Sequence, residues 1–170
     1  MINRAGYTFL LLAGLFGCAL LACTQARQPC LTPRIASLIV ETMHFPTDTA
    51  TTTIDTSLPH AVFVAMPTND SLRGTIYPQQ AVFTLSLSPD STICRWEFTT
   101  DSFKHNFDTL TFFYRRNLQF ISNACGYTYF YSLDSVHTTH DFVDSVLVLN
   151  TSVTNNVNTK HLKIFIHPDF

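Results

Sequence analysis

Apolar and polar residues alternate with a period of two along most of the chain after residue 35. Phe83, Leu85 and Leu87, for example, alternate with Thr84 and Ser86. A period of two is typical of strands with one buried face, and no helical stripe of useful length occurs. The pattern predicts short strands over residues 35–45, 61–66, 81–88, 93–99, 110–114, 126–133, 143–149 and 161–167.

The segments between these strands carry turn and loop chemistry. Pro89-Asp90 combines a fixed φ with a side chain that can bond its own backbone, and the Thr-rich residues 47–57 predict an exposed loop. Residues 143–149 are continuously apolar from Val146, as in a strand buried on both faces. We therefore predict an all-β fold, a single Ig-like antiparallel β-sandwich of eight or nine strands, with a small β-barrel as the alternative.

The N-terminal 23 residues have a different pattern. Arg4 precedes an apolar run from Tyr7 to Leu21, and Leu20-Leu21-Ala22-Cys23 closes it. The run is about 15 residues long, whereas a permanent transmembrane helix needs about 20. This order indicates a bacterial lipoprotein signal peptide with Cys23 as the lipidated residue.

Two other interpretations of this segment are a plain secretory signal and an uncleaved anchor. Residues 19–21 lack the two small residues of a plain cleavage site, and an anchor needs a longer span. Cys18 is a second candidate for lipidation, but a bulky Phe16 stands before it. The predicted organisation is a removed signal at 1–22, the lipidated Cys23 and a tether at 23–34, and one β-sandwich domain at 35–170.

Composition excludes several classes of function. Apolar residues make up 46% and charged residues 13%, with 15 Phe, which excludes a disordered chain. The formal charge of −2 argues against a nucleic-acid partner, which would require a basic patch.

The cysteines predict an oxidising compartment. With Cys18 and Cys23 used by the signal, Cys30, Cys94 and Cys125 remain, and three thiols allow one disulfide in three possible pairings. Their spacings do not resemble a zinc site.

Catalytic and metal-binding patterns are weak. His137 and His140-Asp141 form a loop cluster, while His161 and His167 would lie about 20 Å apart on an extended strand, too far to share an ion. We expect solvated loop histidines and no bound metal or cofactor. No Gly-x-Ser-x-Gly elbow or phosphate-binding loop occurs, and both Glu residues, Glu41 and Glu97, fall within predicted strands. A non-enzymatic protein is therefore expected.

The best candidate for binding is the row Tyr127, Tyr129 and Tyr131. Side chains two apart on a strand share a face, and such a row of rings can hold a sugar or a peptide. The alternative is that these rings form the inner face of a central strand.

Several stretches together carry a family resemblance. They are residues 30–34 (CLTPR), 108–114 (DTLTFFY), 120–126 (FISNACG) and 160–165 (KHLKIF). In this order they resemble a family of small Bacteroidetes envelope lipoproteins with a domain of unknown function. The resemblance implies a β-rich lipoprotein and a Cys30–Cys125 disulfide, which the chain-entropy model values at up to about 4.7 kcal/mol. Cys94 would then be a buried free thiol.

These observations together predict a lipoprotein of the outer membrane that faces the periplasm. Its expected role is that of a non-enzymatic binding or accessory module, held in the membrane through Cys23, with an unknown envelope protein or glycan as its partner. A glycan-binding protein that uses the three tyrosines is the first alternative, and a metal-assisted hydrolase is the second.

Overall fold

The computed structural model describes residues 29–44, 52, 54–55, 57–66, 75–101, 103 and 106–167. The predicted signal peptide, Cys23 and most of the predicted 47–57 loop lie outside the described residues. The chain divides into residues 1–30 and a larger unit, Leu31–Phe170, whose fold is given below. No helix in the described ranges has the length and apolarity to span a membrane.

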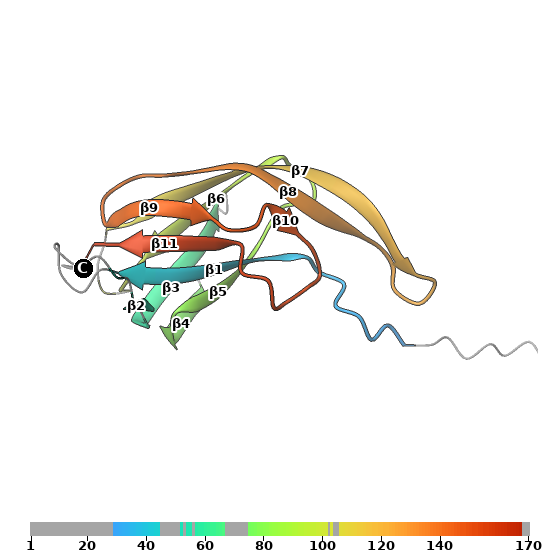
Figure 1. Ribbon diagram of the computed structural model, residues 1–170, viewed down its shortest axis with the longest axis horizontal. Helices are drawn as coiled ribbons and strands as arrows, with labels where there is room; N and C mark the ends of the chain where they lie inside the picture. Colours follow the sequence, from blue (N-terminus) through green and yellow to red (C-terminus); the bar gives the residue numbers. More distant parts are fainter. Residues whose placement is uncertain are drawn as a thin grey trace, which may run out of the picture. The chain divides into compact units, whose positions relative to one another are not determined.

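The described part of the unit is built from strands, which form two sheets (Figure 1). This arrangement confirms the predicted all-β sandwich. The strands are β1 (Ser37–His44), β2 (Ile54–Asp55), β3 (Leu58–Met66), β4 (Thr75–Gln80), β5 (Val82–Ser86), β6 (Ile93–Thr99), β7 (Asp108–Ser122), β8 (Gly126–Thr138), β9 (Val143–Val148), β10 (Ser152–Val153) and β11 (Leu162–Ile166).

The first sheet is organised around β1. On one side β1 pairs with β11 in parallel, and β11 in turn pairs with β9. On the other side β1 pairs with β5 and then with β2, both antiparallel. The β1–β11 pair is the departure from the purely antiparallel sandwich that the sequence predicted.

The second sheet has the order β10-β8-β7-β6-β3-β4. Its β7 and β8 form a hairpin of 15 and 13 residues, longer than the predicted 110–114 and 126–133. Residues 115–120 are all exposed, and the short alternation of Leu118 and Phe120 was not enough to predict a strand there. The edge strand β4 was also missed, because it contains Pro78, which only edge strands tolerate well.

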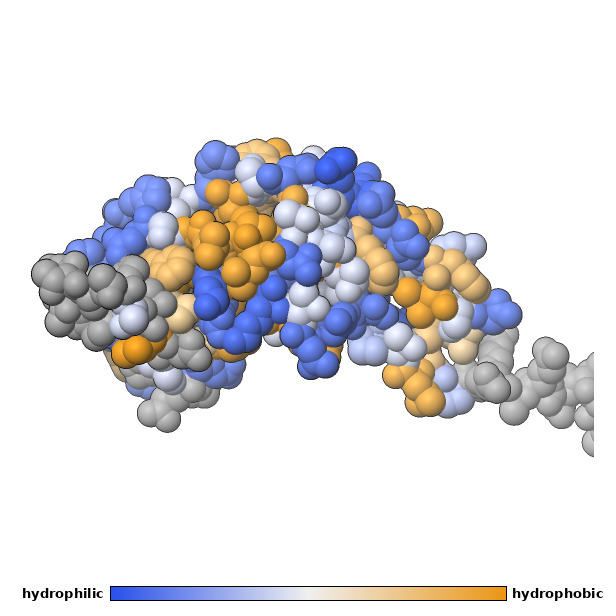
Figure 2. Space-filling view, viewed as in Figure 1, coloured by the Kyte–Doolittle hydropathy of each residue, from blue (hydrophilic) through white to orange (hydrophobic). Residues whose placement is uncertain are grey.

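The prediction that residues 143–149 are buried on both faces is wrong. β9 lies at the edge of its sheet, and Leu147 and Leu149 are about half exposed. Val146 and Val148 pack against the core from the other face of the strand. Figure 2 shows an apolar patch in the region of β9 and β11.

Aromatic side chains fill the space between the sheets. Phe63 on β3 meets Phe83 on β5 of the other sheet, with ring centroids 4.9 Å apart, and stacks on Phe98 of β6 at 4.4 Å. All three side chains are fully buried, and each such burial contributes about 1.5–3 kcal/mol. The core therefore depends on the Phe-rich composition.

The chain passes from one sheet to the other several times, and two of these places are described here. At Ala81 the chain leaves β4 and enters β5, and the Ala81 carbonyl accepts a hydrogen bond from the Thr42 backbone on β1. The second place is the segment 139–142, between β8 and β9.

The 139–142 crossover is held by the buried carboxylate of Asp108. Oδ1 accepts hydrogen bonds from the Thr139 hydroxyl at 2.7 Å and from the Asp141 N–H at 3.0 Å. Oδ2 accepts from the N–H groups of Phe142 at 2.9 Å and Val143 at 2.8 Å. Asp108 is fully buried, so these four donors take the place of its water shell.

We expect Asp108→Asn to destabilise the fold by about 3 kcal/mol, because the new amide nitrogen cannot accept hydrogen bonds and leaves donors unpaired. Urea unfolding measures the change. Asp134→Asn is the matched control: Asp134 pairs with Arg115 on the surface, and its loss should cost less than about 1 kcal/mol. Equal costs for the two variants would contradict the role given to Asp108.

Candidate functional site

The outer half of the β7–β8 hairpin carries an aromatic surface, called the hairpin face below. Its cross-strand pairs are Arg116 with Tyr131, Leu118 with Tyr129, and Phe120 with Tyr127. Residues directly opposite in an antiparallel pair point to the same side of the sheet. The face therefore joins the predicted tyrosine row to three side chains of β7.

The three tyrosines differ in exposure along this face. Tyr131 is buried: its hydroxyl donates to the Leu87 carbonyl at 3.2 Å, and its ring meets Tyr114 edge-on at 5.4 Å. Tyr129 is half-buried, with the Arg116 guanidinium 6.0 Å from its ring centroid. Tyr127 is 65% exposed. The row therefore begins in the core and ends in solvent, and the three rings do not form one exposed face.

At the end of the hairpin, Tyr127 has an aromatic neighbour across the strands. The Phe120 ring lies 5.2 Å from the Tyr127 ring, and Phe120 and Leu118 are 54% and 57% exposed. Neither β7 residue was predicted as part of a site, although the alternation of Leu118 and Phe120 was available as a signal. Their pairing with the tyrosines became visible only with the register of the hairpin.

The hairpin turn carries the predicted disulfide. Cys125 lies in the turn before Gly126, which adopts a positive φ of 73° that glycine tolerates. The structure confirms the Cys30–Cys125 bond, which the family resemblance implied. The chain beyond Cys30 also contacts the domain: the Thr128 hydroxyl donates to the Arg34 carbonyl, and the Asn155 amide donates to the Pro33 carbonyl at 3.2 Å.

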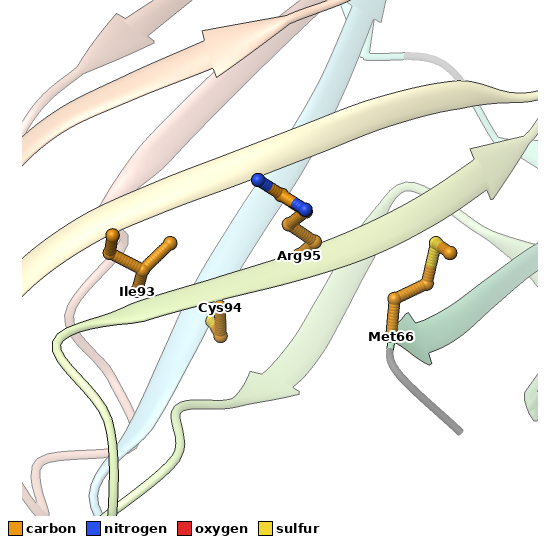
Figure 3. Close-up of a pocket in the computed structure, with 4 residues that line it drawn as sticks. All are labelled: Met66, Ile93, Cys94 and Arg95. Atoms are coloured by element: carbon orange, nitrogen blue, oxygen red, sulfur yellow. The ribbon is translucent and has the colours of Figure 1, made fainter. Parts of the chain in front are cut away.

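Cys94 is a free thiol, as predicted, although it is half-buried rather than buried. It belongs to a pocket of about 280 Å³ that Met66, Ile93 and Arg95 also line (Figure 3). The pocket lies where β3 ends at Met66. Figure 3 shows Ile93 and Arg95 on one side of β6 and Cys94 on the other.

The surroundings of Cys94 do not activate it. Burial raises the pKa of the thiol, and a hydrogen bond with the Tyr114 side chain opposes this only in part. Burial raises the pKa of Tyr114 as well, and the neighbouring Cys94 adds to the increase. Since the thiolate is the nucleophilic form, a raised pKa makes Cys94 a poor nucleophile near neutral pH.

The histidine candidates are separated in the structure. His137 is exposed and its ring packs edge-on against Phe113, while the Nδ1 of His140 contacts the Val143 carbonyl at 2.9 Å. His167 is exposed next to β11. In the described part of the chain, no group of three or more His, Cys, Asp or Glu side chains is arranged to hold a metal ion.

His161 contradicts the expectation of solvated histidines, because it is fully buried. Its Nδ1 accepts a hydrogen bond from the Ile39 backbone N–H at 3.0 Å. The backbone N–H of His161 donates to the Ile39 carbonyl at 2.9 Å. Nδ1 is therefore unprotonated. Nε2 forms no hydrogen bond of good geometry within the described residues. Burial lowers the pKa of the imidazole, and the nearby Ser152 backbone opposes this decrease only in part.

Glu41 is a buried carboxylate on the central strand β1. The ammonium group of Lys160 contacts one carboxylate oxygen, and that of Lys163 lies 3.8 Å from the other. The two ammonium groups compensate the charge of this buried carboxylate.

Comparison with known proteins gives a family but no function. A family model described as "Family of unknown function (DUF6452)" matches residues 61–166. The match runs from β3 to the end of β11 and includes Cys94 and Cys125. Neither a curated protein nor a solved structure matches the chain.

We expect Cys94 to react slowly with iodoacetamide at pH 8 in the native protein and faster in denaturant, because burial restricts access and its raised pKa lowers the thiolate fraction. Peptide mapping by mass spectrometry measures the labelling. In the control variant Cys94→Ser/Thr92→Cys, an exposed thiol two residues away should react readily in the native state. Equal native rates at the two positions would contradict this account of Cys94.

We expect stability to decrease as the pH falls below about 6.5, the usual pKa of histidine. The folded pKa of His161 is lowered, so the unfolded chain binds a proton there that the folded chain does not, until the pH passes below the folded pKa. His161→Asn keeps an acceptor near the Ile39 N–H but does not titrate. Urea unfolding at pH 7.5 and 5.5 should show a smaller decrease for this variant. An equal decrease would exclude His161 as a source of the pH dependence.

Proposed function

The chain belongs to the DUF6452 family of unknown function, and we propose that it is a lipid-anchored, non-enzymatic binding or accessory module of the bacterial cell envelope. The lipid would be attached to Cys23 after removal of residues 1–22. The domain that follows would act by contact with a partner rather than by catalysis.

The disulfide is the observation that carries this proposal. Stable disulfides form in oxidising compartments such as the periplasm and are rare in the cytosol. Cys30 and Cys125 are far apart in sequence, so their bond closes a long loop of the folded domain. A chain with such a bond fits an exported protein, and the order of charge, apolar run, small residue and cysteine before it supplies the export signal.

The anchored position follows from the N-terminal sequence. The residues after Cys23, TQARQP, contain no acidic run of the kind that resembles a surface-export signal. We therefore propose the periplasmic side of the outer membrane, in line with the resemblance to Bacteroidetes envelope lipoproteins.

The other two functions have less support. A glycan site built on three tyrosines loses Tyr131, which is part of the core. A metal-assisted hydrolase has no observation in its favour among the described residues. The proposed partner is accordingly an envelope protein that contacts the exposed strands of the domain.

We expect Cys23→Ser to abolish incorporation of labelled palmitate and to move the protein from the membrane fraction to the soluble fraction, because the thiol that accepts the lipid is gone. Labelling of cells followed by fractionation measures both. Cys18→Ser is the matched control in the same segment and should leave labelling and membrane association unchanged. Palmitate labelling that persists in Cys23→Ser would overturn the proposed anchor.

A further inference from the structure

We propose that the end of the β7–β8 hairpin lies against the surface of the membrane that holds the lipid of Cys23, and that it contacts anionic lipid there. This inference rests on the lipid anchor proposed above. The contact surface consists of the outer part of the hairpin face (Leu118, Phe120 and Tyr127) together with the chain that leads into β1 (Leu31 and Ile35).

Covalent reach is the first argument. Six residues lie between Cys23 and Cys30, and even a fully extended chain over these seven Cα-to-Cα steps spans only about 25 Å. Cys30 is bonded to Cys125 in the hairpin turn. A lipid on Cys23 would thus hold the hairpin end within a short distance of the bilayer.

The apolar residues at this end of the domain are the second argument. Leu31 is 90% exposed and Ile35 is also exposed, in addition to Leu118, Phe120 and Tyr127 of the hairpin. Arg34 lies between Leu31 and Ile35 in the sequence, and its carbonyl accepts a hydrogen bond from the Thr128 hydroxyl of the hairpin. Figure 2 shows apolar surface at the end where the hairpin lies in Figure 1.

The kind of side chain fits an interface between lipid and water. Tyrosine has an apolar ring and a polar hydroxyl, and such residues are enriched at the headgroup level of membranes. Phe120 and Leu118 beside it can enter the boundary of the acyl chains. Tyr131, in the buried half of the same row, packs in the core instead, so the exposed half is the part that can reach a membrane.

Charge supplies the preference for anionic lipid. Residues 115–131 contain two arginines, Arg115 and Arg116, and no Asp or Glu, and Arg34 is the charged residue of segment 31–35. Arg115 pairs with the exposed Asp134, whereas Arg116 contacts the Pro89 carbonyl and the Tyr129 ring. Basic residues close to an anionic membrane are attracted to its surface.

Tryptophan quenching by brominated lipid tests the contact. The full chain, expressed and lipidated in cells, is reconstituted into vesicles of phosphatidylethanolamine and phosphatidylglycerol with brominated acyl chains. Trp96 is replaced by Phe, and Phe120→Trp supplies the probe. We expect bromine to remove most of the emission of this variant and its spectrum to shift to the blue relative to detergent.

Phe103→Trp in the same background is the matched control. Phe103 is 79% exposed and lies in the connection between β6 and β7, at the other end of β7, so its emission should be unaffected by bromine. If Phe120→Trp prevents cooperative folding, Tyr127→Trp takes its place with the same expected result.

The outcomes separate this inference from the anchor. Protein that floats with the vesicles while the hairpin probe is not quenched overturns the membrane contact and leaves the anchor intact. A blue shift without quenching that increases with protein concentration assigns the face to a second copy of the chain, and likewise overturns the contact. Protein that neither floats nor carries lipid overturns the anchor, and the membrane contact with it.

Discussion

The sandwich depends on the carboxylate of Asp108. This side chain stands at the first residue of β7, at the opposite end of the strand from the hairpin turn. It accepts hydrogen bonds from the backbone N–H groups of the crossover between β8 and β9, one of those that carry the chain from one sheet to the other. A crossover near a core would otherwise leave these donors without water or partners. Because the carboxylate satisfies them together, β9 can begin directly against the core at Val143, which is fully buried. β9 then provides the edge with which β11 pairs, and β11 in turn pairs with β1.

Around this connection the aromatic residues play two roles that depend on depth. Between the sheets, Phe63, Phe83 and Phe98 bury their rings completely and contribute to the stability of the core. Along the hairpin the same class of residue continues past the point where the other sheet can cover it. Tyr131, Tyr129 and Tyr127 mark this passage from buried to half-buried to exposed. A single alternating sequence thus serves the core at its base and a surface at its end.

The sequence predicted those features that a period of two encodes, and it failed where other constraints determined the structure. Phe83 and Leu85 pointed to the core as expected, because alternation on a half-buried strand specifies its inner face. The outer half of β7 was not predicted, since its exposed residues carry only the short alternation of Leu118 and Phe120. The apolar run at 143–149 was misinterpreted because hydrophobicity does not distinguish a central strand from an edge strand. The burial of His161 follows from its pairing with Ile39, 122 residues earlier in the chain, which no local pattern shows.

The parallel pairing of β1 with β11 determines when the domain can be completed. Among the described strands, β1 is the first in the sequence, and its central partner β11 is the last. Until that partner emerges, one edge of β1 has unpaired backbone groups and the strand presents the apolar surface of Leu38 and Val40. Folding of such non-local topology is slow, because loop closure over most of the chain precedes the gain from pairing. The nascent domain therefore has a long interval in which a chaperone that recognises open strand edges would have its best opportunity to bind.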